Sequence, residues 1–185
     1  MHERSSGKRH ALRTEHAVEA YLNLSAVESF LRGQQPFYAV LDAARHDHVL
    51  AWILASGLEQ ASLYEGEEGQ RVRMEADSPG LQTLLEQGWG QAWGIFLCCS
   101  LPFAEVRRQL RRFLTVRLPE GRSAYFRFYD PRVLRDFLPG FSPEEVREFL
   151  GPIQSVFLEG TSPQECWWFH WNGQELVSRM MTPSA

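Results

Sequence analysis

The stretch GIFLCCSLPFAEVRRQLRRFL, residues 94–114, contains the two kinds of element that decide the fold. Residues 94–100 are almost continuously apolar and too short for a core helix, which predicts a buried strand. Residues 102–114 carry an apolar stripe at helical spacing, with arginines on the opposite side. The stripe consists of Phe103, Val106, Leu110 and Phe113. A buried strand followed by an amphipathic helix predicts helices packed on a sheet.

The rest of the chain alternates in the same way. Further strands are expected over 37–44, 61–64, 115–118, 124–129, 153–158 and 166–171. Further helices are expected over 25–33, 48–56, 79–88, 131–138 and 143–150. This order predicts an α/β or α+β fold, in which helices flank a mixed β-sheet within a single compact domain.

Capping sequences mark four of the expected helix starts. Residues Ser25 to Glu28 and Ser142 to Glu145 each form a capping box. Ser78-Pro79 and Asp130-Pro131 each place an N-cap residue before a proline at the first helical position.

Three segments are expected along the chain. Residues 1–14 are polar and predict a disordered or loose tail, and residues 15–158 predict the core domain. Residues 159–185 carry CWWFHW and a turn at Asn172-Gly173, which predicts an aromatic strand or hairpin packed on the core.

Charge, cysteine content and the N-terminus indicate a cytoplasmic protein. The formal net charge of −4 excludes a globally basic nucleic-acid binder, although residues 101–135 hold nine arginines and three acids. The three cysteines form no disulfide pattern, so reduced, buried thiols are expected. The first twelve residues lack the apolar core of a secretion signal, and no apolar run reaches the ~20 residues of a membrane span.

A search for catalytic chemistry yields one weak candidate. His46 and His48 could share a metal in a small metal-dependent hydrolase, but three or four ligands are needed and no second cluster supplies them. The other interpretation is a polar loop with Asp47 as the N-cap. The sequence has no nucleophile elbow and no phosphate-binding loop. We therefore expect no enzyme activity, cofactor or bound metal.

Two sets of residues are candidates for partner binding. Arg107, Arg108, Arg111 and Arg112 form one side of the 102–114 helix. This side could be a solvated face, a surface for an acidic protein or a nucleic-acid-binding module. The second set is Trp167, Trp168 and Trp171. These rings could form an exposed docking strand or complete the core.

Several blocks resemble one protein family, in order and in spacing. Tyr38-Ala-Val-Leu-Asp42-Ala-Ala-Arg45 is similar to an opening motif usually written Tyr-Ala-Leu-Leu-Asp-Gly-Ala-Arg. The other blocks are Trp93 to Leu97, Phe126 to Leu134, Leu138-Pro139, and Phe149 to Pro152. Together they resemble the domain of unknown function carried by type VI secretion effector adaptors.

The resemblance implies a non-enzymatic adaptor or chaperone. Such proteins bind a cognate toxic effector and load it onto the spike protein VgrG, without binding nucleic acid or inserting into a membrane. The motif residues expected to form the scaffold are Asp42, Arg45, Trp93, Arg127, Tyr129, Asp130, Pro131 and Arg132. The charged ones among them are expected to form an ion-pair network or to contact the partner directly. Arg127 is expected within reach of Asp42 or Asp130.

Overall fold

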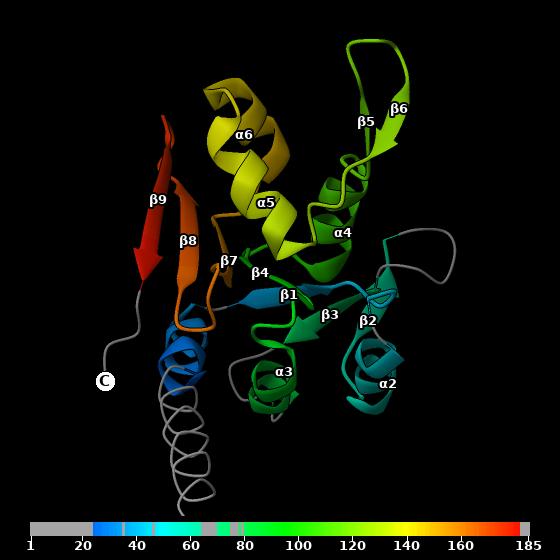
Figure 1. Cartoon of the computed structure of the whole chain (residues 1–185), viewed down its shortest axis with the longest axis vertical. Coiled ribbons are helices and arrows are strands. Elements are labelled where there is room, and N and C mark those ends of the chain that lie inside the picture. The colour runs from blue at the N-terminus through cyan, green and yellow to red at the C-terminus, as the bar shows by residue number, and fades with distance from the viewer. Residues whose placement is uncertain are drawn as a thin grey trace, which may run out of the picture.

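A computed structural model describes residues 24–34, 36–45, 47–63, 70–74, 78 and 80–181, with only the backbone described for 70–74. One seven-stranded sheet runs through these residues in the order β2-β3-β1-β4-β7-β8-β9 (Figure 1). Its strands are β1 (Phe37–Leu41), β2 (Gln60–Ser62), β3 (Gln70–Met74), β4 (Gly94–Cys98), β7 (Ser155–Glu159), β8 (Cys166–Trp171) and β9 (Leu176–Met181). The helices and this sheet confirm the predicted α+β fold.

The sheet is antiparallel at every pairing, so the expectation of a mixed sheet is wrong. Strand β3, which the sequence analysis missed, explains the difference. Helical crossovers normally join parallel strands that are neighbours. Here α2 and α3 do connect parallel strands, but in each case another strand lies between the two, so the neighbours in the sheet are antiparallel. Strand β3 lies between β1 and β2, and β1 lies between β3 and β4.

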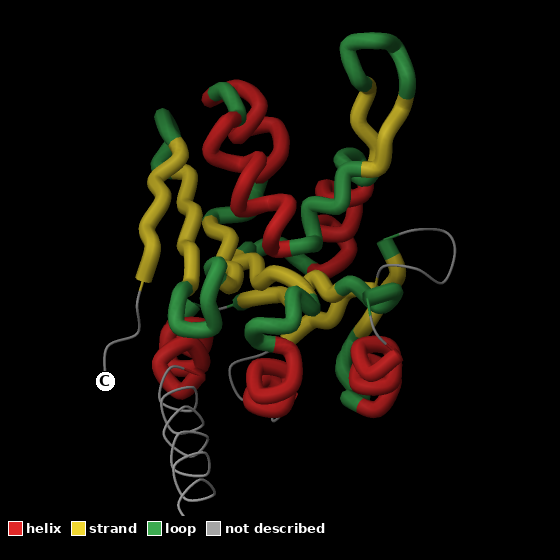
Figure 2. Tube along the Cα trace, viewed as in Figure 1, coloured by secondary structure: helices red, strands yellow, loops and turns green. Residues whose placement is uncertain are grey.

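Helices cover both faces of the sheet (Figure 2). A helix over 24–33, α2 (Asp47–Ala55) and α3 (Gly80–Gly88) cover one face. The other face carries α4 (Phe103–Arg111), α5 (Pro131–Phe137) and α6 (Pro143–Leu150).

Each helix layer has its own hydrophobic core. Alternate residues of the central strands enter opposite cores, as Tyr38 and Phe37 of β1 do. All five β1 residues are therefore buried, which accounts for the continuous apolar run.

The β5–β6 hairpin stands apart from the main sheet and projects beyond α4 (Figure 1). It consists of β5 (Thr115–Arg117) and β6 (Ser123–Tyr125). The expectation of a strand continuing to Tyr129 is wrong, because the backbone turns at Phe128 and Tyr129. This turn buries both rings, whereas a strand would place Tyr129 on the same face as the exposed Arg127.

Two of the four predicted caps form as expected. The Asp130 carboxylate accepts the backbone N–H of Arg132, and Ser142 and Glu145 form a reciprocal capping box. Ser78 precedes α3, but its hydroxyl makes no hydrogen bond with the residues that the structure describes. Ser25 lies inside the 24–33 helix, so its predicted cap is wrong.

Strands β8 and β9 form a hairpin that completes one side of the main sheet. The turn is fixed by the Asn172 side chain, whose Oδ1 accepts the backbone N–H groups of Gln174 and Glu175 at 2.9 Å each. The domain division at residue 158 stays a prediction, and the predicted tail over 1–14 lies outside the described residues.

None of the helices in the described part of the chain has the length and apolar character that crossing a bilayer requires.

Candidate functional site

Three of the five sequence blocks that carry the family resemblance meet at one end of the sheet. Asp42 follows β1, Trp93 precedes β4, and Asp130 caps α5. The Asp42 backbone N–H donates to the Trp93 carbonyl at 2.8 Å, which joins the first two blocks. The third block joins them through the side chain of Arg127.

Arg127 forms an ion pair with Asp42 across 85 residues of sequence. The Asp42 side chain is only 2% exposed, whereas that of Arg127 is 48% exposed. Burial alone would lower the pKa of Arg127, but the hydrogen bond and charge of Asp42 outweigh it and raise that pKa. The Arg127 guanidinium also lies 5.8 Å from the centre of the Tyr129 ring. Asp42 and the Tyr129 ring therefore hold the guanidinium in place, while about half of the Arg127 side chain stays open to solvent.

Asp130 fixes a second arginine at the start of α5. Its carboxylate accepts two side-chain hydrogen bonds from Arg132, from Nε at 2.9 Å and from Nη2 at 2.6 Å, in addition to the capping bond. Burial would raise the pKa of Asp130, but these bonds and the charges of Arg132 and Arg45 lower it below its usual value. The Asp130 side chain is 3% exposed and that of Arg132 is 52% exposed.

Glu159, at the end of β7, is a third buried carboxylate and holds the turn before β4. Its two oxygens accept the backbone N–H groups of Gly90 at 2.7 Å and Ala92 at 2.9 Å. Both residues have positive φ, 79° and 56° respectively, a conformation that costs Ala92 strain energy. Burial raises the pKa of Glu159, although the two N–H donors partly oppose that rise.

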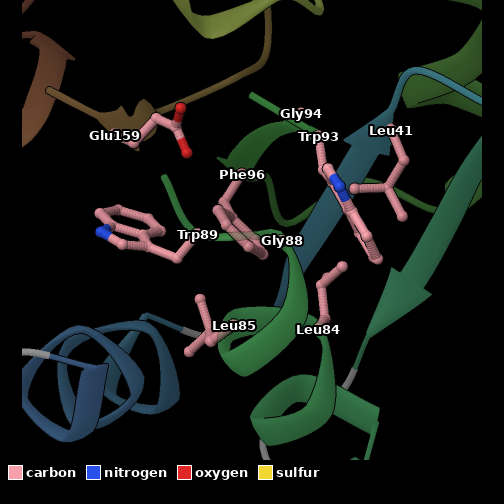
Figure 3. Close-up of a pocket in the computed structure, with 9 residues that line it drawn as sticks. All are labelled: Leu41, Leu84, Leu85, Gly88, Trp89, Trp93, Gly94, Phe96 and Glu159. Carbon is pink, nitrogen blue, oxygen red and sulfur yellow. The ribbon is translucent and has the colours of Figure 1, made fainter. Parts of the chain in front are cut away.

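The sequence analysis missed Glu159, because nothing near it in the sequence indicates that a distant turn needs an acceptor. Figure 3 shows Glu159 at the rim of a small cavity that Trp89, Trp93 and Phe96 help to line. The cavity has room for roughly a single water molecule. Trp89 also donates its indole N–H to the Pro163 carbonyl at 2.9 Å. These hydrogen bonds hold the turn rigidly, and the cavity beside it is too small for a ligand larger than water.

We call Arg45, Arg127, Arg132 and Arg135 the arginine cluster. Arg45 donates to the Gln91 carbonyl at 3.3 Å, and Arg135 to the Glu159 carbonyl at 3.4 Å. Buried carboxylates, turn carbonyls and a helix cap thus hold these four side chains near one another. Arg127 and Arg132, whose side chains are about half exposed, present fixed, cationic hydrogen-bond donors that suit carboxylate groups of another protein, whereas the Arg135 side chain is only 15% exposed.

The four predicted arginines behave differently from one another; three lie in α4, and Arg112 is its C-cap. Arg107 donates to the Ser62 carbonyl at 2.9 Å, and Arg112 pairs with Glu148 of α6 at 3.3 Å. Arg108 pairs with Glu105 of its own helix, and Arg111 is partly buried. Two of the four therefore connect α4 to neighbouring elements.

The three tryptophans of β8 are all partly buried and lie on both faces of the sheet. Trp167 and Trp171 pack against the core beneath α4 to α6, and Trp168 against the opposite core. The Trp167 ring stacks on Phe169 with centroids 5.7 Å apart, and the Trp168 ring on His170 at 5.2 Å. The Trp168 indole N–H is buried without a hydrogen-bond partner in the described part of the molecule.

His46 lies outside the described residues, so the predicted His46–His48 pair does too. Within the described ranges, no three or more His, Cys, Asp or Glu side chains are grouped to hold a metal ion. All three cysteines are buried free thiols. Burial raises the pKa of Cys98 and Cys99, and that of Cys166 to about 11.

These features define a seven-stranded antiparallel sheet between two helix layers, with an ion-paired surface at one end. Residues 37–148, more than half of the chain, match the family described as Domain of unknown function (DUF4123), and the chain belongs to this family. The family is associated with type VI secretion. Comparison with curated proteins and with solved structures gives no match.

Proposed function

We propose that this protein is a cytoplasmic type VI secretion adaptor that binds a toxic effector and loads it onto the spike protein VgrG. Family membership supports the secretion context. The observation that carries the binding role is the arginine cluster, where buried carboxylates hold half-exposed guanidinium groups.

A fixed arginine is well suited to binding protein. An arginine that is already immobilised loses little side-chain entropy when a partner arrives, so more of its interaction energy goes into affinity. Asp42 engages one nitrogen of Arg127, and Asp130 engages two of Arg132. Each guanidinium has five N–H donors, so both retain donors for a carboxylate on the partner.

The proposal also holds that the protein is not an enzyme. A nucleophilic cysteine needs a lowered pKa and an exposed position, and the three thiols have raised pKa values and are buried. Glu159 has a raised pKa of the kind that a catalytic acid can show, but both of its oxygens are occupied by backbone donors. Its role here is to hold the turn.

The test is co-purification of the full chain with candidate VgrG and effector proteins from the same genome. The wild-type chain is expected to recover both. Arg132→Gln keeps the Arg132 backbone N–H that Asp130 accepts but removes the exposed charge, and it is expected to weaken the complex about tenfold or more, as at an interface hot spot. Arg122→Gln, at an exposed position in the β5–β6 turn, is the matched control and should bind normally.

Three other results would contradict parts of the proposal. Wild-type protein that recovers neither partner would reject the adaptor role. A complex that Arg132→Gln leaves unchanged would remove the arginine cluster from the interface. Stoichiometric metal in the purified chain, lost when His46 and His48 are both replaced by Ala, would favour the hydrolase.

A further inference from the structure

The two edges of the main sheet differ in length and in character. At one edge, β2 has three residues, Gln60 to Ser62. At the other edge, β9 has six residues, pairs with β8 along its whole length and contains neither proline nor glycine. No other strand in the described ranges pairs with the outer side of β9. A long, regular edge strand offers a row of backbone groups to which another strand can be added.

The hydrogen-bonding pattern of the hairpin identifies those groups. The Asn172 backbone N–H donates to the Glu175 carbonyl, so this pair faces inward. Hydrogen-bonded pairs alternate along an antiparallel ladder, which makes His170–Val177 and Trp168–Arg179 the next inward pairs. The intervening residues Leu176, Ser178 and Met180 must therefore direct their backbone N–H and C=O groups away from β8.

The side chains of β9 distinguish its two faces. Leu176 and Met180 lie opposite Trp171 and Trp167 and share their face of the sheet. Leu176 packs against the core there, whereas Met180 is 53% exposed. An apolar side chain on an added strand could cover Met180.

The opposite face of β9 carries a positive charge. Arg179 lies over the Trp168 ring at 5.7 Å and is exposed. It forms no ion pair with any residue that the structure describes. An added strand could supply the missing carboxylate at this position.

The edge is continuous with the arginine cluster. Glu159 of β7 pairs with Cys166 of β8, and Cys166 pairs with Met181 of β9. The backbone of Met181, at the end of β9, thus lies two strand spacings, about 10 Å, from that of Glu159, whose carbonyl accepts a hydrogen bond from Arg135. One partner could contact both surfaces, and both carry arginines that suit acidic groups.

We propose that the outer edge of β9 accepts an extended segment of a partner protein as an eighth strand. The segment carries apolar side chains on the Met180 face and a carboxylate opposite Arg179. Backbone hydrogen bonds to Leu176, Ser178 and Met180 supply affinity, and the alternating side chains supply selectivity. This inference rests on the proposed adaptor function and places one of its binding surfaces.

A second copy of the chain fits this edge less well. Self-pairing with the fullest overlap, centred on Ser178, would place the two Arg179 side chains diagonally on the same face, about 8 Å apart. Like charges at that spacing oppose association, and no described acidic side chain pairs with Arg179 to offset them. An acidic partner strand removes this repulsion.

The experiment uses the complex of the full chain with the same candidate VgrG and effector proteins. Ser178→Pro removes one outward N–H and leaves the β8 pairing intact, because proline is tolerated where the N–H faces outward. Ser178→Ala keeps that N–H and is the control. Hydrogen exchange across 176–181 should slow in the wild-type complex, and Ser178→Pro should weaken binding at least tenfold while Ser178→Ala binds normally.

Three other results would overturn all or part of this inference. A complex without added protection over 176–181 would overturn this inference while leaving the adaptor function in place, and this readout needs no variant to fold. Failure of the wild-type chain to bind either protein would overturn both. A self-associated species that Ser178→Pro converts to monomer would assign the edge to a second copy and overturn the choice of partner.

Discussion

The molecule has two groups of arginines, and they are held in different ways. In the arginine cluster, Arg127 and Arg132 pair with Asp42 and Asp130, whose side chains are 2% and 3% exposed. On α4, Arg112 pairs with Glu148, which is 64% exposed. In the sequence, the arginines of both groups are charged residues in or near predicted helices. Only in the cluster do arginines pair with buried carboxylates.

The difference determines what each group contributes. An exposed ion pair contributes about 0–1 kcal/mol, because water and salt screen it and both side chains lose freedom. A buried carboxylate that loses its partner is poorly solvated. The free energy lost on removing the arginine therefore exceeds the net stabilisation that the intact pair contributes. We therefore expect the cluster to support both folding and binding, and the exposed α4 pairs to contribute little to folding.

The largest effect is expected from Arg127→Ala. It leaves the Asp42 carboxylate buried without its charged partner. The free energy of unfolding should fall by about 2 kcal/mol, less than for a fully buried pair because Arg127 is half exposed. Urea unfolding of the two proteins measures this.

Asp42→Asn tests the reason for that effect. If the unpaired charge causes the loss, adding Asp42→Asn to the Arg127→Ala variant should restore part of the stability, giving a coupling of about 0.5–3 kcal/mol. Additive losses would show that the two side chains act independently.

Asp130→Ala is the next largest change. It removes an N-cap as well as the carboxylate that fixes Arg132. The loss of the cap alone should lower the free energy of unfolding by about 1–2 kcal/mol. Asp136→Ala is the control, because Asp136 is 70% exposed, caps no helix and makes only a 3.6 Å contact with Arg135 among the ion pairs of the described residues. Equal losses in the two variants would contradict the prediction.

The pH dependence of stability separates two of the buried carboxylates. Glu159 has a raised pKa, so the folded protein binds its proton more tightly than the unfolded chain does. Its contribution therefore favours folding increasingly as pH falls from neutral through that raised pKa. Asp130 has a lowered pKa, so its stabilisation is present above the unfolded pKa and is lost as pH falls through the folded one.

Glu159→Gln and Asp130→Asn should therefore change the pH profile in opposite directions. Relative to wild type, Glu159→Gln should lose the gain in stability on mild acidification. The stability of Asp130→Asn should fall less than that of wild type as the pH is lowered further. Thermal melts between neutral pH and the ordinary carboxyl range measure both, and parallel profiles would contradict the assignment of opposite pKa shifts.

The smallest effect is expected from Arg112→Ala. Both partners of the Arg112–Glu148 pair are more than half exposed. Its removal should change the free energy of unfolding by no more than about 0.5 kcal/mol. A loss comparable to that of Arg127→Ala would end the distinction between the two groups of arginines.

Much of the fold was predictable because local signals were sufficient. Apolar runs identified β1, β4, β7 and β8, and the caps at Asp130 and Ser142 gave the starts of α5 and α6. Strand β3 was missed because its sequence, QRVRM, alternates but has only two apolar residues. The run to Tyr129 was misread as strand because three buried aromatic rings in irregular backbone give the same local pattern as a strand.

The candidate site was predictable only in part. The resemblance identified Asp42, Arg127 and Asp130, and the structure pairs Arg127 with Asp42, one of its two expected partners. Glu159 could not be found in this way, because its function depends on a turn 67 residues earlier in the chain. A residue that satisfies distant backbone groups has no signature in its own neighbourhood.

The order of the strands also affects how the protein can be made. Strands β1 to β4 are synthesised first and together form one half of the sheet, but the free edge of β4 pairs with β7, which follows only after α4, α5 and α6. Until β7 leaves the ribosome, the nascent chain carries an apolar strand edge and an uncovered sheet face, the features that favour aggregation and engage chaperones. A pause in translation before β7 therefore prolongs the time during which the edge of β4 is unpaired and prone to aggregation. Once β7 has emerged, it can pair with β4 and complete the centre of the sheet.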